Sequence, residues 1–178
     1  MNTPDNKRRR ESQEKIMKAF VRQLQNKELA QISVTEICHE AGINRSTFYA
    51  NYLDIYDLAD QFAESMIDSF FKMYAEEIEY HFHSYNFAKL LQNIKENPLV
   101  YEAFMKLDVE ITDLMGSKFN YAAIGDDIIQ KYSQEFAKAG MNAVIKLWIL
   151  DGCAEPPSQI EKVLQKYIKA GDTMPDKW

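Results

Sequence analysis

The chain has 178 residues, of which 46% are hydrophobic and 12% aromatic, so it is long and apolar enough to bury a substantial core. Its formal net charge of −6 argues, by itself, against a nucleic-acid partner. The charge is unevenly distributed, however: residues 1–52 contain nine Lys or Arg and six Asp or Glu, whereas residues 53–178 contain twelve and 21. A basic N-terminal part joined to an acidic remainder is typical of a protein that touches DNA with one end only.

Low Gly and Pro content and the lack of alternating apolar and polar residues predict an all-α fold. The two cysteines, Cys38 and Cys153, lie in different halves of the chain, which is neither a disulfide framework nor a zinc-binding pattern. The basic stretch at residues 7–10 precedes charged residues, so we expect no secretory signal. No stretch approaches the roughly 20 apolar residues that span a bilayer. We therefore expect a cytoplasmic protein with no membrane partner.

The N-terminus combines a loose tail at residues 1–6 with a run of four basic residues, Lys7, Arg8, Arg9 and Arg10. This run is either a solvated terminus or an arm that binds DNA. A basic arm gains salt-dependent affinity by releasing counterions from phosphates, and a disordered one can enter a minor groove. Arg8, Arg9 and Arg10 are thus candidate DNA contacts. The first helix is expected over residues 11–25, with an apolar face.

Residues 34–52, VTEICHEAGINRSTFYANY, predict two short helices around a tight turn. In the first helix, apolar residues recur at helical spacing, and Ser33 or Thr35 can cap its start. Gly42 follows the last apolar residue and can adopt the left-handed conformation that ends a helix. Ile43 is expected to be buried beneath the turn.

Asn44 is the predicted N-cap of the second helix, whose first turn then contains Arg45, Ser46 and Thr47. In a helix-turn-helix these residues enter the major groove, where the fork of an arginine matches the acceptors of guanine. Thr35, Tyr49 and Tyr52 are candidate phosphate contacts, and Asn44 belongs to the same DNA-binding set. An ordinary helical hairpin is the alternative, because glycine between two helices is common.

Residues 10–58 resemble the DNA-binding domain of TetR-family transcription regulators. The matching features are, in order, Ile16, Ala19 and Phe20, then residues 32–37, then Ala41-Gly42-Ile43, then residues 46–49, Tyr52 and Leu58. Two positions depart from the family pattern. Ala50 and Ile55 stand where the family often has basic residues that grip the DNA backbone. The resemblance implies a three-helix DNA-binding head over residues 1–57. It also implies a helical-bundle domain for effector binding and dimerisation over residues 58–178.

Asp54 is the predicted N-cap of a long helix over residues 55–80, which in TetR-like proteins links the head to the body. Further helices are expected over residues 87–95 and 99–107, broken at Asn97-Pro98, and over residues 121–132. His81 and His83 form a pair without a third ligand, so we expect neither a metal nor another cofactor. Aromatic residues and methionine suit an effector pocket or a core equally well. The candidate pocket residues are Phe70, Tyr74, Tyr101, Phe104, Met105 and Trp148.

Residues 135–150 predict a helix with an unusually wide apolar face, ended by Asp151-Gly152, and a last helix follows over residues 158–169. Two consecutive amphipathic helices suit a four-helix interface between two copies, although they could cover their own subunit's core instead. The TetR resemblance favours the dimer. The candidate interface residues are Gly140, Ala143, Val144, Leu147, Ile160, Val163, Leu164 and Tyr167. The pattern from Gly140 to Cys153 also resembles regulators of dihydroxyacetone kinase operons, some of which act with a protein partner.

Together these features predict a homodimeric, sequence-specific DNA-binding regulator, namely a ligand-responsive repressor on a pseudo-palindromic operator. Its effector would be a small molecule or a protein that favours a conformation unable to fit the DNA. The chain has no Ser-His-Asp ordering and no Gly-rich phosphate loop, so we expect no enzymatic activity and no catalytic residues. The alternative is a helical protein-interaction module whose hairpin no longer binds DNA tightly.

Overall fold

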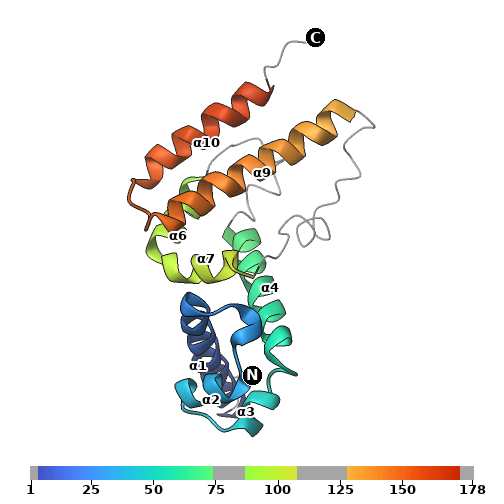
Figure 1. Ribbon diagram of the computed structural model, residues 1–178, viewed down its shortest axis with the longest axis vertical. Helices are drawn as coiled ribbons and strands as arrows, with labels where there is room; N and C mark the ends of the chain where they lie inside the picture. The colour runs from blue at the N-terminus through green and yellow to red at the C-terminus, as the bar shows by residue number, and fades with distance from the viewer. Residues whose placement is uncertain (1–3, 74–86, 108–127, 173–178) are drawn as a thin grey trace. The chain divides into compact units, whose positions relative to one another are not determined.

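A computed structural model of the chain describes residues 4–73, 87–107 and 128–172 (Figure 1). These residues form eight α-helices and one short 3₁₀ helix, with no strand among them, which confirms the predicted all-α class. Within the same ranges, no helix is both long and apolar enough to cross a membrane. The pattern of contacts divides the chain into two compact units. The first comprises Met1–Asp68 and Leu99–Val109, and the second Ser69–Pro98 and Glu110–Trp178.

The first helix, α1, spans Pro4–Asn26, so the prediction that it begins at residue 11 was wrong. The basic run is part of this helix and not a disordered arm. Proline suits a first helical turn, because its backbone angle is already set and it needs no amide partner there. An ion pair one turn apart, between Lys7 Nζ and Glu11 Oε1 at 3.9 Å, also favours the helical form. The arginines therefore project from a helix surface.

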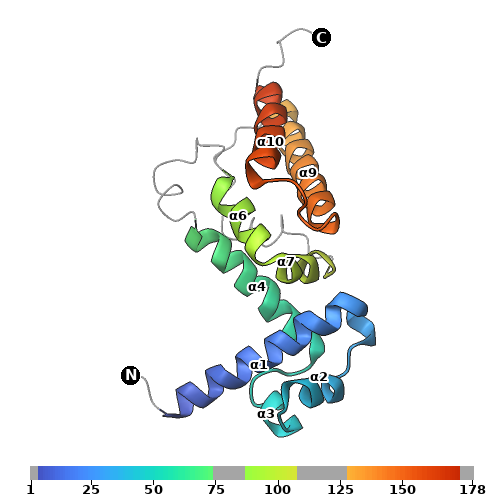
Figure 2. The same ribbon diagram turned by 90° about the vertical axis from the view of Figure 1, so that its left-hand side faces the viewer.

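Three aromatic rings organise the core of the first unit. Phe20 of α1 meets Phe62 of α4 (Ile55–Met73) edge to face, with ring centroids 6.0 Å apart. Phe62 in turn meets Phe104 of α7 (Pro98–Met105) at 6.3 Å. Figure 2 shows α4 crossing α1 in this unit. Because Phe62 lies on α4, the compact unit extends beyond the expected head boundary at residue 57.

At the start of α4, two aspartate carboxylates accept hydrogen bonds from backbone amides. Asp54 Oδ1 accepts hydrogen bonds from the backbone amides of Tyr56 and Asp57 at 2.8 and 2.9 Å, which confirms Asp54 as the N-cap. Asp57 Oδ2 accepts from the Leu53 amide at 2.7 Å. This backbone hydrogen bond is the main reason that the pKa of Asp57 is lowered. The helix is described as far as Met73, and the rest of its predicted length lies outside the described residues.

The C-terminal end of α1 is held by residues at and beyond the ends of α7. Lys106 Nζ donates to the carbonyl oxygens of Leu24 and Gln25 at 2.8 and 2.9 Å. Gln25 Nε2 donates to the Leu99 carbonyl at 3.0 Å. The last carbonyls of a helix lack partners inside the helix, and a cation there also complements the helix dipole. These contacts join α7 to α1, although the sequence between them is long.

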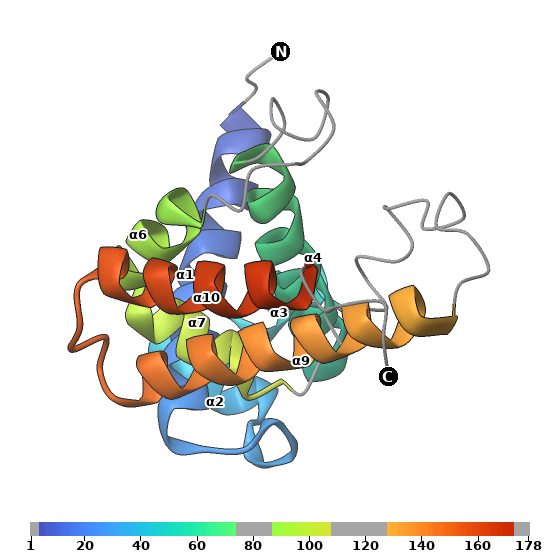
Figure 3. The same ribbon diagram turned by 90° about the horizontal axis from the view of Figure 1, so that it is seen from above.

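The second unit contains α6 (Ala88–Glu96), α9 (Ile128–Leu150) and α10 (Pro157–Asp172). Helix α10 packs against both α6 and α9, and Figures 1 and 3 show α9 and α10 side by side. The predicted break before Pro98 and the predicted stop at Gly152 are both confirmed. The expected boundary between a helix ending at residue 132 and one beginning at residue 135 was wrong. No glycine or proline separates them, and α9 continues through both positions.

Trp148 anchors the end of α9. Its side chain is buried, and its indole Nε1 donates to the Glu155 carbonyl at 3.1 Å. Lys95 Nζ donates to the same carbonyl at 3.3 Å. The helix ends where Gly152 adopts a φ of 71° and the Cys153 amide donates back to the Trp148 carbonyl at 2.8 Å. This closes the last turn and fixes the connection into α10.

Candidate nucleic-acid interface

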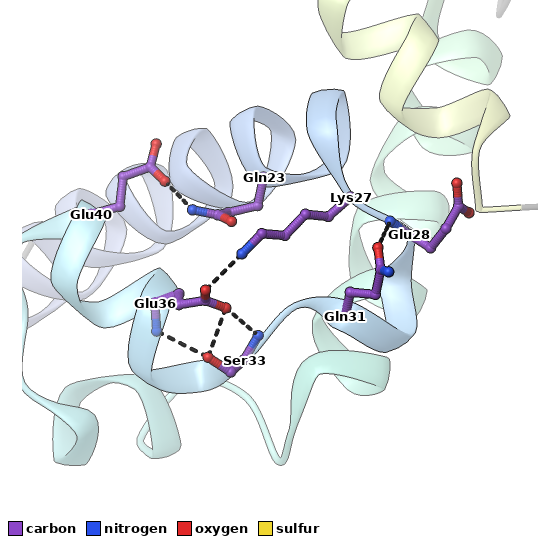
Figure 4. A network of polar contacts seen from close by, with 7 residues as sticks. All are labelled: Gln23, Lys27, Glu28, Gln31, Ser33, Glu36 and Glu40. Atoms are coloured by element: carbon purple, nitrogen blue, oxygen red, sulfur yellow. Dashed lines mark hydrogen bonds and ion pairs between the residues drawn. The ribbon is translucent and has the colours of Figure 1, made fainter.

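Helix α2 (Val34–Ala41) begins with a capping box, and the Glu36 side chain of this box also contacts Lys27. Ser33 Oγ accepts from the Glu36 amide at 3.3 Å, and the Ser33 amide donates to Glu36 Oε2 at 3.2 Å. Of the two predicted caps, Ser33 and Thr35, the structure thus has Ser33. Lys27, the first residue after α1, places its Nζ 2.6 Å from Glu36 Oε1 (Figure 4). The hydrogen bond from Lys27, and then those from Ser33, lower the pKa of Glu36.

Separate polar contacts lie near the other end of α2 (Figure 4). Gln23 Nε2 donates to Glu40 Oε2 at 2.7 Å, and Arg22 Nη1 lies 3.8 Å from Glu40 Oε1. Between α1 and α2, the 3₁₀ helix Leu29–Gln31 is closed by the Glu28 amide, which donates to Gln31 Oε1 at 3.0 Å. Polar contacts at both ends of α2 thus fix its position on α1.

The turn after α2 has the geometry that its sequence predicts. Gly42 adopts φ 63° and ψ 41°, and the Ile43 amide donates to the Cys38 carbonyl at 3.0 Å, which is the closing bond of a Schellman motif. Cys38 is buried, as expected of a small core residue, and burial raises the pKa of its thiol. Ile43 is only half-buried, so it is not the fully buried plug that we expected.

Helix α3 is short, spanning Arg45–Tyr49. Asn44 occupies its N-cap position as predicted, but the Asn44 side chain makes no capping hydrogen bond. Phe48, with no exposed surface, attaches the helix to the core. Tyr52 lies beyond the end of α3, only 4% exposed, with its ring 5.6 Å from that of Phe48. The expectation that Tyr52 contacts phosphate is therefore corrected: it is a core residue, and burial is the main cause of its raised pKa.

The remaining polar residues of α3 and its cap are accessible. Asn44, Arg45 and Ser46 are exposed, Thr47 is half-buried, and Tyr49 is 49% exposed. Arg45 Nη2 donates to Tyr49 Oη at 3.4 Å, and the guanidinium carbon lies 5.9 Å from the Tyr49 ring centroid. The Tyr49 hydroxyl thus has Arg45 as a partner within the protein. Outside α3, Thr35 is exposed near the start of α2.

A hydrogen-bonded chain joins the basic start of α1 to the end of α3. Arg9 Nε donates to Asn51 Oδ1 at 3.3 Å, and Asn51 Nδ2 donates to the Thr47 carbonyl at 2.8 Å. Sequence reasoning missed Asn51, although a side-chain amide just after a short helix is a recognisable partner for a terminal carbonyl. The side chains of Arg8 and Arg10 are exposed on the same stretch of α1. Arg9 thus lies beside the end of α3, and Arg8 and Arg10 are exposed next to it in the chain.

The candidate effector-pocket residues are not gathered within one unit. Tyr101, Phe104 and Met105 belong to the first unit, while Phe70 and Trp148 belong to the second. Phe104 and Trp148 are buried by the packing described above, and the other three are half-buried. Tyr74 and the His81–His83 pair lie outside the described residues.

The candidate dimer residues divide into two groups. Ile160 and Leu164 are buried within their own unit, which corrects their assignment to an interface, and Val144 is half-buried. Gly140, Ala143 and Leu147 are exposed, Val163 is 38% exposed, and the side chain of Tyr167 is outside the described set. Sequence reasoning did not assign further exposed hydrophobic residues of α9 to an interface, partly because it placed a helix boundary there. They are Ile128, Tyr132, Phe136 and Leu150, each at least 62% exposed.

These exposed residues share one face of α9. Their spacing of three or four positions, continued by Gly140, Ala143 and Leu147, follows the helical repeat. We call this set of seven residues the α9 stripe. It combines bulky side chains at both ends with small residues in the middle. The opposite face of α9 provides the buried residues Ile145, Trp148 and Ile149.

No described protein family and no curated protein matches this chain.

Proposed function

We propose that this protein is a homodimeric, sequence-specific DNA-binding regulator of transcription, acting as a ligand-responsive repressor, in which α2 and α3 form a helix-turn-helix. The observation that carries the proposal is the chain from Arg9 through Asn51 to Thr47. It places one arginine of a basic run beside a short helix whose own start, at Arg45 and Ser46, is exposed. A hairpin with a purely structural role has no need of such a surface.

Within this proposal, the residues divide into two roles. Arg45, Ser46 and Thr47 read base edges in the major groove, where arginine pairs with guanine through two hydrogen bonds. Arg8, Arg9, Arg10 and Thr35 contact phosphates, which position the protein and add salt-dependent affinity.

The chain's two departures from the TetR pattern are consistent with these roles. Ala50 adjoins Asn51, so Arg9 provides positive charge close to the position where the family often has a basic residue. Ile55 is 7% exposed and belongs to the core, so that position is not available for a phosphate contact. Phosphate binding would then depend on α1 more than it does in typical TetR-like proteins.

The α9 stripe supports the homodimer in the proposal. A row of exposed apolar residues along 23 residues of helix is an unfavourable surface to leave in water. Small residues in its centre would let a second copy of the helix approach closely. Two copies would present two α3 helices to successive major grooves, roughly 34–36 Å apart or more, on an inverted repeat.

The effector would act through the elements that belong to both units. Helix α4 passes from the first unit to the second after Asp68, and the chain returns at Leu99, at the start of α7. A ligand that binds one arrangement of these helices more tightly would shift the population towards it. Once the operator is known, a screen for compounds that release the protein from it would identify the ligand. In this proposal the protein is cytoplasmic and not an enzyme.

The test is selection of bound fragments from random duplex DNA, followed by affinity measurements at several salt concentrations. We expect an inverted repeat bound by two subunits. Removing one phosphate contact with Arg9→Ala should reduce the slope of log affinity against log salt by about one. Lys162→Ala, which removes the same charge from exposed α10, is the matched control and should leave the slope unchanged.

A helical protein-interaction module is the second candidate, favoured by the α9 stripe and by the acidic remainder of the chain. If the selection recovers no motif even at low salt, this candidate replaces the regulator. The stripe would then be the place to search for a protein partner.

A further inference from the structure

We propose that Tyr49 is a positioning residue, which holds the guanidinium of Arg45 in one direction and thereby strengthens the discrimination of bases by Arg45. The inference rests on the proposed DNA-binding function. It differs from the expectation that Tyr49 contacts a phosphate, because its effect on binding would pass entirely through Arg45.

The two side chains are placed to interact before any DNA is bound. Arg45 and Tyr49 are four residues apart, so they lie on the same face of α3. The Arg45 Nη2–Tyr49 Oη distance of 3.4 Å is long for a hydrogen bond, but the guanidinium carbon also lies 5.9 Å from the ring centroid. The hydroxyl and the ring face therefore act on the same group.

The Tyr49 ring, which is 49% exposed, contacts the core on one side. It meets Phe48 edge to face, with ring centroids 5.5 Å apart and an interplanar angle of 87°. Phe48 has no exposed surface, so it cannot move without disturbing the packing of the unit. Tyr49 thus connects a rigid element to Arg45, which as a long, exposed side chain would otherwise sample many rotamers.

Holding the Arg45 guanidinium in one direction would strengthen its recognition of guanine. Two parallel hydrogen bonds to guanine require the fork of Arg45 to point along the base edge. A side chain held near that direction loses less conformational freedom on binding. Loss of Tyr49 should therefore weaken binding to the correct sequence more than binding to other sequences.

The experiment is a double-mutant cycle on the selected operator, compared with operators in which each conserved guanine pair is replaced in turn. We expect Arg45→Ala to reduce the discrimination at one guanine about tenfold or more. Tyr49→Ala should reduce discrimination at that same position about two- to fivefold, the range of an exposed cation–π contact. Tyr49→Phe, which keeps the ring, should have a smaller effect. In the Arg45→Ala background, Tyr49→Ala should have no further effect.

Two results would overturn the inference while leaving the proposed function intact. One is an equal loss of affinity from Tyr49→Ala with and without Arg45, which indicates a direct phosphate contact. The other is unchanged discrimination in Tyr49→Ala. Failure of the wild-type protein to select any sequence would overturn both proposals. Thermal unfolding monitors the fold of each variant, and Tyr49→Leu replaces Tyr49→Ala in the cycle if the alanine variant is unfolded.

Discussion

The turn between α2 and α3 offers a sharp test of the local structure, through the substitution Gly42→Ala. Gly42 has a φ of 63°, and an added Cβ would meet no atom within 4 Å. The cost is therefore conformational and not steric. Placing alanine in the left-handed region costs about 1–2 kcal/mol. The reduced freedom of the unfolded chain offsets about 0.4–1 kcal/mol of this. The expected net loss in the free energy of unfolding is therefore between about 0 and 1.6 kcal/mol.

The assay is thermal and urea unfolding followed by circular dichroism. For a unit of this size, each kcal/mol lowers the midpoint temperature by about 4–8 °C. Gly42→Asn is the matched control, because asparagine tolerates the left-handed region far better than alanine does. We expect Gly42→Asn to lie between the wild type and Gly42→Ala. Equal stability of the alanine and asparagine variants would refute the reasoning, since it would show that backbone conformation does not determine the cost.

Three further predictions concern other parts of the molecule. Lys106→Met should lower the free energy of unfolding by about 1–3 kcal/mol, because two carbonyls at the end of α1 lose a charged donor; urea unfolding measures this, and Lys162→Met should have no effect. Glu36 has a lowered pKa when folded, so its stabilising contribution is present above its ordinary value of 4.5 and lost as the pH falls below it. A pH series of thermal midpoints should therefore be flatter in Glu36→Gln, and a parallel series would contradict this. Phe136→Glu, at a position 82% exposed, should leave the monomer folded but weaken self-association at least tenfold in sedimentation experiments; unchanged association would remove the α9 stripe from the interface.

The parts of the fold that could be predicted from the sequence are those decided within a few residues. Ser33 and Asp54 cap helices because each side chain reaches amides two or three positions ahead. Gly42 and Gly152 end helices because the left-handed conformation suits glycine. These features depend on bonds and torsions close in the chain, so the order of the residues specifies them.

Besides the misplaced starts of α1 and α9, the errors arose where a residue's environment depends on segments far along the chain. Tyr52 was expected to contact phosphate, but it is only 4% exposed and its ring packs 5.6 Å from that of Phe48. Ile160 and Leu164 were expected in a dimer interface, but α6 and α9 cover α10 instead. A hydrophobic period shows that a helix has an apolar face, not which partner covers that face.

For this protein, the sequence by itself therefore determined the all-α class, most helix ends and the exposed residues at the start of α3. Only the tertiary structure decided that Arg9 meets Asn51, that Lys106 closes α1, and that α9 keeps a second apolar face exposed. The physical reason is how far apart in the sequence the interacting residues are. Caps and turns form between neighbours in the chain, whereas contacts between residues 42 or 82 positions apart exist only after the helices have packed.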